Sequence, residues 1–572
     1  MNGYVVRSDA EIWSAFDGDG FVVRKTATWE GMRGYMAEHK TAVNTVTQRP
    51  KQAFYVEGNG YQMGHLIGQL AEKDVRRMTT TFRDKVVLSF IAPNLTGLSH
   101  EAAYQTLLHG VMEWCRRVYG RYRDDVPEPL WQEMQGIVDG CRYGDSASPV
   151  SYEDLLTINV GVDVLVSAIY TGLGLMNWLA AVQPKLALKV PGVAEKPAAE
   201  RTGSGRPPEH RAEHFRVPLN LGCNAFAAFG SAVSDGHVYF GRDFQFPTAE
   251  VFQDTACLVV YNPTYNLPNG RPALPIVSQT APGFAGSVTA VNQLGVGIGV
   301  DMVPSGNCDP GRPGLNSLLM VRHAAHSGYG AARAVDAIVA AQRGASWLYP
   351  IADGRNRQAV VCEAGLTTDE LDYLSYPSDA LKPLLPSGGL RSSLRGVIPR
   401  WSDWEYPNQY FQYNRALFNY MKAPYDPAKF GPTGYLNPDW KQGLDKGYFF
   451  APQRESEPDL LVVTNHYLVP EMRLCAMKEW TNVVAKERTP DILWRYDELN
   501  RQCLDAYGSI DYAKARELVD FLSPKRKFPE YYGANKVIEG SVSLCDLTDL
   551  TMESHFGYQD DEWVKLTLPR YV

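Results

Sequence analysis

The period of the apolar positions changes once along the chain, near residue 221. Before that point Glu72–Arg83, His100–Arg117 and Leu130–Asp139 place apolar residues every three or four positions, which is the period of a helix. We therefore predict that residues 1–182 are mainly helical. Beyond residue 221 the apolar residues alternate with polar ones or form short continuous runs, a pattern typical of strands.

The first two strands are predicted to form a hairpin. Two apolar runs, CNAFAAFGSAV and HVYFGRDFQF, flank Ser234-Asp235-Gly236, and an Asp-Gly step between apolar runs favours a tight turn. This order of strands, two helices and strands again favours an α+β fold with helices packed on antiparallel sheets. Later strands are predicted at 256–261, 274–279, 287–291, 296–303, 347–353 and 357–365, and helices at 315–326, 331–341, 489–507 and 512–522.

Two segments interrupt this pattern. Residues 183–222 are rich in Pro, Ala, Arg and Glu and are predicted to be an exposed connector, while residues 375–455 are an aromatic, Pro-rich insertion. The chain thus divides into a helical segment at 1–182, the connector, and a β-rich part at 223–572. Val164–Val182 carries no charge over nineteen residues, but Ser, Thr, Asn and two Gly interrupt it, so we predict a buried helix rather than a membrane span.

Composition narrows the classes of function. Of the 572 residues, 45% are hydrophobic and 21% charged, which is enough for a large core, and the net charge of −8 argues against a broad nucleic-acid-binding face. The nine cysteines are scattered without a CxxC pair, which indicates neither a disulfide framework nor a structural zinc site. The first residues lack a signal-peptide pattern, so a cytoplasmic location is expected. The HRAEH motif at 210–214 has the spacing of a zinc site but lies in the connector without an apolar face, so it does not predict one. We expect no metal and no cofactor.

Gly222-Cys223 carries the most informative chemistry. The cysteine stands at the start of a strand, directly after the connector, where cleavage of the chain would make it a new N-terminus. Its thiol can attack the carbonyl of Gly222, and hydrolysis of the resulting thioester frees the α-amine. An α-amine has a reference pKa of about 7.7–8.0, so one residue would supply both nucleophile and base. The alternative is a buried strand cysteine without a chemical role.

The hairpin is expected to bring Arg242, Asp243 and Gln245 close to this thiol. A guanidinium there would lower the thiol pKa and hold a substrate carbonyl or carboxylate. The alternative for Arg242 is an ordinary ion pair with an aspartate.

These residues resemble a known family. Gly222-Cys-Asn-Ala-Phe-Ala followed by Asp235-Gly-His-Val-Tyr-Phe-Gly-Arg-Asp-Phe is similar to the opening of the penicillin acyltransferase-like (acyl-coenzyme A:isopenicillin N acyltransferase) autoproteolytic N-terminal-nucleophile (Ntn) hydrolases. That family is related to choloylglycine (bile salt) hydrolases, acid ceramidase and N-acylethanolamine amidase. Further similar motifs lie in the family's order: 60–68 and 133–140 upstream resemble its propeptide side, and 290–300, 313–339, 351–354, 361–363 and 464–467 follow downstream.

The resemblance implies a four-layer αββα sandwich with a helical N-terminal pro-segment, cut between Gly222 and Cys223. Cys223 would be the nucleophile, Arg242 the active-site arginine, and Asn292 a donor to the oxyanion hole. The two chains would stay associated after cleavage.

The sequence departs from the family pattern at two positions. The family aspartate that follows the arginine is Gln245 here, so Asp243 is expected to hold the α-amine instead. The second oxyanion asparagine falls near Trp347–Tyr349, where Tyr349 is a possible substitute donor. Asn465 and His466, in the late strand motif, are further candidates for contact with substrate or oxyanion.

The leading hypothesis is an N-terminal-cysteine amidohydrolase or acyltransferase acting on a linear amide of a small acyl compound. One alternative is a phospholipase B-like ester hydrolase on the same fold, with lipid contact at the apolar segment. The other is a catalytically inactive Ntn-fold binding protein, which the two departures favour. The oligomeric state is left open by the sequence.

Overall fold

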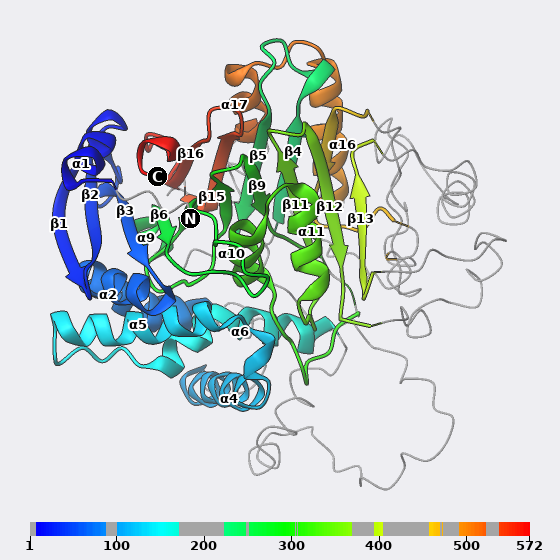
Figure 1. Cartoon of the computed structure of the whole chain (residues 1–572). Coiled ribbons are helices and arrows are strands. Elements are labelled where there is room, and N and C mark those ends of the chain that lie inside the picture. The colour runs from blue at the N-terminus through cyan, green and yellow to red at the C-terminus, as the bar shows by residue number, and fades with distance from the viewer. Residues whose placement is uncertain are drawn as a thin grey trace, which may run out of the picture.

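The computed structural model describes residues 7–86, 100–170, 222–246, 251–303, 305, 307–368, 394–403, 457–469, 472, 491–521 and 537–572. It is a mixed α+β structure, in which helices pack against two β-sheets (Figure 1). The predicted connector at 183–222, except its last residue, and most of the aromatic insertion at 375–455 lie outside the described residues, as does the HRAEH motif. Residues 394–403, within that insertion, carry an ordered strand.

The larger sheet has 11 strands in the described part of the chain. It includes a three-stranded N-terminal meander, which joins the rest where β3 pairs parallel with β6; the other pairings are antiparallel. Its order is β1 (Phe21–Trp29), β2 (Met32–Val43), β3 (Pro50–Gly58), β6 (Cys257–Pro263), β7 (Ile276–Thr280), β8 (Thr289–Asn292), β9 (Val296–Gly299), β11 (Trp347–Asp353), β12 (Gln358–Ala364) and β13 (Val397–Trp401), with β10 (Asp301–Met302) paired to β11.

The smaller sheet has six described strands and carries Cys223. Its order is β14 (Leu460–Val463), β4 (Gly222–Ala228), β5 (Tyr239–Gln245), β15 (Val537–Asp546), β16 (Thr551–Tyr558) and β17 (Val564–Thr567), all antiparallel. The predicted hairpin is confirmed, since β4 and β5 pair from Gly222↔Gln245 to Ala228↔Tyr239.

Helices cover the sheets on different faces. α10 (Ser317–Ser327) and α11 (Ala331–Ala340) pack against the larger sheet, and α16 (Asp491–Asp505) and α17 (Tyr512–Phe521) pack against the smaller one. Between the sheets, Phe240 of β5 packs against Gly297 of β9, and Ser541 of β15 donates a hydrogen bond to Gln279 of β7 at 2.8 Å. The strand that carries Cys223 is therefore held between a helix layer and the larger sheet.

The prediction of a mainly helical N-terminal segment is wrong in part. After α1 (Asp9–Gly18), residues 21–58 form β1, β2 and β3, which extend the larger sheet. These strands mix charged and apolar residues irregularly, and β1 and β2 each contain a register shift, so their period in sequence is weak. Sheet pairing with the core, rather than local pattern, determines their structure.

The rest of this segment is helical, with boundaries that differ from the prediction. It contains α2 (Gly60–Arg77), the short π-helix Met78–Phe82, α4 (His100–Arg121), α5 (Glu128–Gly144) and α6 (Tyr152–Tyr170), drawn in blue to cyan in Figure 1. The helix predicted at 72–83 in fact begins twelve residues earlier, at Gly60. No helix among the described residues is long and apolar enough to cross a membrane.

Glycines explain why the sequence pattern did not predict this early start. A Cβ at Gly60, Gly64 or Gly68 of α2 would lie 2.0–2.3 Å from backbone oxygens of α5. Gly136 and Gly140 of α5 approach α2 equally closely, at 2.1 Å. The two helix backbones are thus in direct contact, which only glycine permits, although glycine itself is a poor helix former.

The N-terminal segment is bound to the C-terminal end of the chain by buried polar contacts. Lys51 of β3 forms an ion pair with Asp561 in which both side chains are at most 3% exposed. The carboxylate of Asp19 accepts hydrogen bonds from the hydroxyls of Thr567 and Tyr571, each at 3.0 Å. Each buried charge depends on its partner, so these contacts fix the N-terminal segment against the smaller sheet.

The spacing of the two sheets yields a testable prediction. A Cβ at Gly299 would lie 2.3 Å from Nε of the buried Arg242, so Gly299→Ala should lower the free energy of unfolding by about 1–3 kcal/mol. Denaturant unfolding of the full chain measures this. The matched control is Gly120→Ala in α4, where a Cβ meets nothing within 4 Å and the change should be neutral or stabilising. Equal effects of the two changes would contradict close contact at Gly299.

Candidate active site around Cys223

Cys223 is the second residue of β4 and is 3% exposed. In the hairpin it pairs with Phe244, and Asn224 pairs with Asp243. Since side chains alternate across a strand, Cys223, Phe244 and Arg242 share the face toward the larger sheet, while Asn224, Asp243 and Gln245 point to the other face. The predicted neighbours of Cys223 are therefore near it in register but lie on two sides of the sheet.

The Cys223 nitrogen is held by a side chain from the neighbouring strand region. Its N–H donates to Oδ1 of Asn465 at 2.7 Å, and Nδ2 of Asn465 donates to the Met302 carbonyl, also at 2.7 Å. Asn465 lies two residues after the end of β14 and is 2% exposed. This contact fixes the nitrogen that would become the α-amine after cleavage. Asn465, rather than Asp243, makes it.

Arg495 of α16 is a site residue that the sequence analysis missed. Its Nη1 donates to the Cys223 carbonyl at 2.7 Å and to Oδ1 of Asn224 at 2.5 Å, and its Nη2 donates to Oδ1 of Asn465 at 2.7 Å. The side chain is 2% exposed. One guanidinium thus fixes the backbone of the cysteine and the side chain that holds its nitrogen. No local pattern marks it, because it lies 272 residues from Cys223 in sequence.

Gly222 has a steric reason to be glycine. A Cβ there would lie 2.8 Å from Nη2 of Arg495 and 2.9 Å from Oε1 of Gln245. Contacts under 3.0 Å would displace one of these side chains. The residue before the cysteine therefore has to be small if Arg495 is to reach the backbone of β4.

Arg242 lies between the two sheets rather than in the pocket. It is fully buried, forms an ion pair with Asp301 of β10, and donates to the Val300 carbonyl. Its Nη1 also donates to the Asn224 carbonyl at 3.0 Å. These contacts match the alternative interpretation, an ordinary Arg–Asp pair. Both terminal nitrogens of Arg242 donate to groups of the protein.

Asp243 and Gln245 form a polar cluster behind the strand. Oδ2 of Asp243 accepts hydrogen bonds from Nδ2 of Asn224 at 3.0 Å and from Nε2 of Gln245 at 2.6 Å. Burial raises the pKa of Asp243 to about 7, although its hydrogen bonds and the charge of Arg495 oppose this. The structure does not place this carboxyl group on the Cys223 nitrogen, where the sequence interpretation expected it.

The environment of the thiol raises its pKa. Burial is the main cause and raises the pKa of Cys223 to about 11, while Asp301 raises it further and Arg242 opposes it. The expected lowering by the guanidinium is therefore real but smaller than the cost of burying a thiolate. In the uncut chain the thiol is protonated at neutral pH and needs a base to become nucleophilic.

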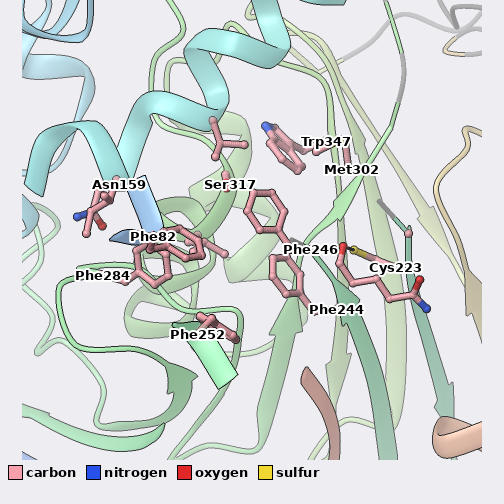
Figure 2. Close-up of a pocket in the computed structure, with 15 residues that line it drawn as sticks. Phe82, Asn159, Cys223, Phe244, Phe246, Phe252, Phe284, Met302, Ser317 and Trp347 are labelled. Carbon is pink, nitrogen blue, oxygen red and sulfur yellow. Dashed lines mark hydrogen bonds between the residues drawn. The ribbon is translucent and has the colours of Figure 1, made fainter. Parts of the chain in front are cut away.

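Cys223 lines an apolar pocket (Figure 2). The lining comes from both halves of the chain. Phe82 lies in the π-helix and three residues lie on α6, whereas Cys223 and Phe244 belong to the β4–β5 hairpin. Aromatic rings dominate, and Phe82 packs against Phe246, Phe252 and Phe284 with ring centroids 5.5–6.3 Å apart. The full lining is Phe82, Ile158, Asn159, Val162, Gly222, Cys223, Phe244, Gln245, Phe246, Phe252, Phe284, Met302, Ser317, Leu318 and Trp347.

Asn292, predicted as an oxyanion donor, is not part of this pocket lining. Both hydrogens of its amide are used, because Nδ2 donates to the carbonyls of Ala325 and Gly328 at 3.0 and 2.8 Å. Its Oδ1 accepts from the backbone N–H groups of Leu294 and Val296. Asn292 therefore fixes the β8–β9 turn to the end of α10, and the structure does not bring it to Cys223.

The remaining predicted residues have other contacts. The Tyr349 hydroxyl accepts a hydrogen bond from the backbone N–H of Ser317 at 3.0 Å, and Tyr349 does not line the pocket. His466 has its Nδ1 2.9 Å from the Thr464 hydroxyl, and its ring packs edge-on against Tyr496 of α16. Both residues thus support neighbouring parts of the site rather than facing the pocket.

One group among the described residues has the composition of a metal site. Ligand atoms of His237, Asp546 and Asp549 lie within 4.8 Å of one another, at the end of β5 opposite to Cys223. His237 Nδ1 already lies 2.7 Å from the Asp546 carboxylate, an ion pair that explains the arrangement without a metal.

Comparisons with known proteins give partial matches. No family model matches the chain. An uncharacterized protein from Archaeoglobus fulgidus is 28% identical over 548 residues, which covers 95% of this chain and 68% of that protein.

Three solved structures are similar over about three fifths of the chain. They are an N-acylethanolamine-hydrolyzing acid amidase ortholog from Caenorhabditis elegans (TM-score 0.30, 12% identity, 59% of this chain and 95% of that one), a conjugated bile acid hydrolase mutant from Clostridium perfringens (0.31, 10%, 61% and 93%) and penicillin V acylase from Agrobacterium tumefaciens (0.30, 12%, 60% and 84%).

The raised thiol pKa predicts how Cys223 reacts in the uncut chain. The thiolate fraction grows as pH rises toward 11, so iodoacetamide labelling should increase about tenfold between pH 9 and pH 10, whereas an unfolded cysteine with a pKa of about 8.5 is already mostly ionised at pH 9 and changes little. The peptide that spans residues 222 and 223 reports the uncut chain, and the same peptide from denatured protein is the control. A plateau at the same pH in both would contradict the effect of burial.

Proposed function

We propose that this chain is an Ntn hydrolase that cleaves a linear amide through an acyl-enzyme on Cys223. The observation that carries the proposal is one arrangement: a cysteine at the start of a strand has its nitrogen held by Asn465 and lines an apolar pocket. An Ntn nucleophile needs its α-amine fixed close to its own side chain, and an acyl group needs an apolar cavity.

In the proposed maturation the Cys223 thiol attacks the Gly222 carbonyl and forms a thioester, while the peptide nitrogen takes a proton and becomes the α-amine. Water then hydrolyses the thioester. The products would be chains of 222 residues and, since the full chain has 572, of 350 residues. The contacts of β3 with β6 and of Lys51 with Asp561 support their continued association. On this proposal the layers around the two sheets form the αββα sandwich, with residues 1–182 on the first chain.

In the proposed catalytic cycle the free α-amine takes the thiol proton, and sulfur attacks the substrate carbonyl. Collapse of the tetrahedral intermediate breaks the C–N bond, and the proton passes to the leaving amine. Water or an acceptor amine then attacks the thioester and releases the acyl group. Asn465 is the proposed oxyanion donor in place of Asn292, because it already contacts the Cys223 nitrogen and its Nδ2 carries two hydrogens.

Intact-mass measurement tests maturation. The purified protein should show the two chains, and Cys223→Ala should leave a single 572-residue chain without amidase activity. Cys257→Ala, which changes a fully buried strand cysteine outside the pocket, is the matched control and should still be cut. An active enzyme that remains one uncut chain would contradict the proposal.

Substrate chemistry separates the amidase from an ester hydrolase or an inactive protein. We expect an N-acyl substrate to acylate Cys223, with a mass increase on the peptide that contains it, and to be turned over. A matched O-acyl substrate provides the comparison. Preferential turnover of the ester would favour the phospholipase B-like function, and an unlabelled Cys223 with both substrates would favour a binding protein.

A further inference from the structure

Asn159, Trp347 and Ser317 line the apolar pocket and differ in how the surrounding protein uses their hydrogen-bonding groups. The amide of Asn159 is saturated, since Nδ2 donates to the carbonyls of Leu155 and Gly283 and Oδ1 accepts from the N–H of Ala285. The indole Nε1 of Trp347 donates to the Asp163 carboxyl group at 2.9 Å. Neither of these side chains has a donor left for a ligand in this arrangement.

Ser317 differs from them. It lines the same pocket and is 7% exposed, yet among the described residues no group forms a hydrogen bond with its hydroxyl. The Ser317 oxygen is not fully buried, so it keeps surface that a molecule in the pocket can reach, and polar groups in such places normally have a hydrogen-bond partner. An unsatisfied hydroxyl that faces a cavity lined by aromatic rings therefore indicates a partner that enters the cavity.

The backbone of Ser317 supports this interpretation. Its φ is +51°, in the left-handed region that favours glycine, although it is the first residue of α10. The Tyr349 hydroxyl holds its N–H at 3.0 Å and so stabilises this conformation. Strained non-glycine residues persist where the surrounding structure fixes them, and such residues concentrate at ligand sites.

We propose that Ser317 is a specificity-determining residue, and that the acyl group bound beside Cys223 carries an oxygen function on an otherwise apolar body. A hydroxyl or an ether oxygen on the acyl group would form the missing hydrogen bond, and the aromatic lining would enclose the hydrocarbon on either side. This inference rests on the proposed function, because it specifies the acyl group of that reaction.

The test measures binding without turnover. Cys223→Ala protein is titrated calorimetrically with dodecanoic acid, with a positional series of monohydroxydodecanoic acids and with the matching ether-containing acids. We expect the best oxygen-bearing acid to bind about tenfold more tightly than dodecanoic acid, as one net hydrogen bond allows. A gain for hydroxyl and ether acids alike identifies an acceptor on the ligand, and a gain for the hydroxy acids alone identifies a ligand donor.

Substitutions at Ser317 separate the hydroxyl from the backbone strain. In the same background Ser317→Ala should reduce the preference for oxygen-bearing acids to about onefold, and Ser317→Gly should do the same while removing the strain. The matched control is Ser346→Ala, a buried serine outside the pocket lining whose hydroxyl donates to the Asn307 carbonyl, and it should keep the preference.

The outcomes distinguish this inference from the proposed function. A preference that survives both Ser317→Ala and Ser317→Gly, or equal binding of plain and oxygen-bearing acids, would overturn the inference and leave the amidase intact. If amide turnover by the unsubstituted enzyme is absent while Ser317 still determines the preference, the proposed function fails and the binding inference stands.

Discussion

The buried ion pair between Arg242 and Asp301 is the interaction on which the arrangement of this molecule depends. It joins the strand next to Cys223 to the larger sheet, and both side chains are fully buried. A charge in such a place is tolerated only with its partner and its hydrogen bonds in position, and breaking such a pair typically costs about 3–5 kcal/mol. The separation of the sheets and the position of β4 are therefore fixed together.

The Arg242 guanidinium also helps to position the candidate active site around Cys223. By donating to the Asn224 carbonyl it holds the backbone one residue beyond Cys223, and Arg495 holds the Cys223 carbonyl from the helix side. Two arginines from different elements thus fix successive peptide groups of one strand. The thiol is positioned by the backbone that carries it, so its own side chain is left to face the pocket.

Local sequence patterns predicted the parts of the structure that local interactions determine. The Asp-Gly turn correctly predicted the pairing of β4 with β5, and the apolar period predicted α10 and α11. The N-terminal strands were missed because sheet pairing outweighs their weak alternation, and the start of α2 was missed because its glycines serve backbone contact with α5. Arg495 could not be found, since no sequence pattern relates residues 272 positions apart. The role predicted for Asn292 came from a motif, which cannot show that its amide is already used by the turn and by α10.

The parallel pairing of β3 with β6 has a consequence for the durability of the protein. In a single chain this ladder forms within one molecule, and refolding after heat is a unimolecular process. If the backbone is cut between Gly222 and Cys223 as proposed, the same ladder would join two molecules, and its recovery would depend on their concentration. The N-terminal chain would also take Phe82 and the α6 residues with it, so separation would remove one wall of the pocket. After maturation the stability of the protein would then be kinetic rather than reversible. The enzyme would last only as long as its two chains stay associated.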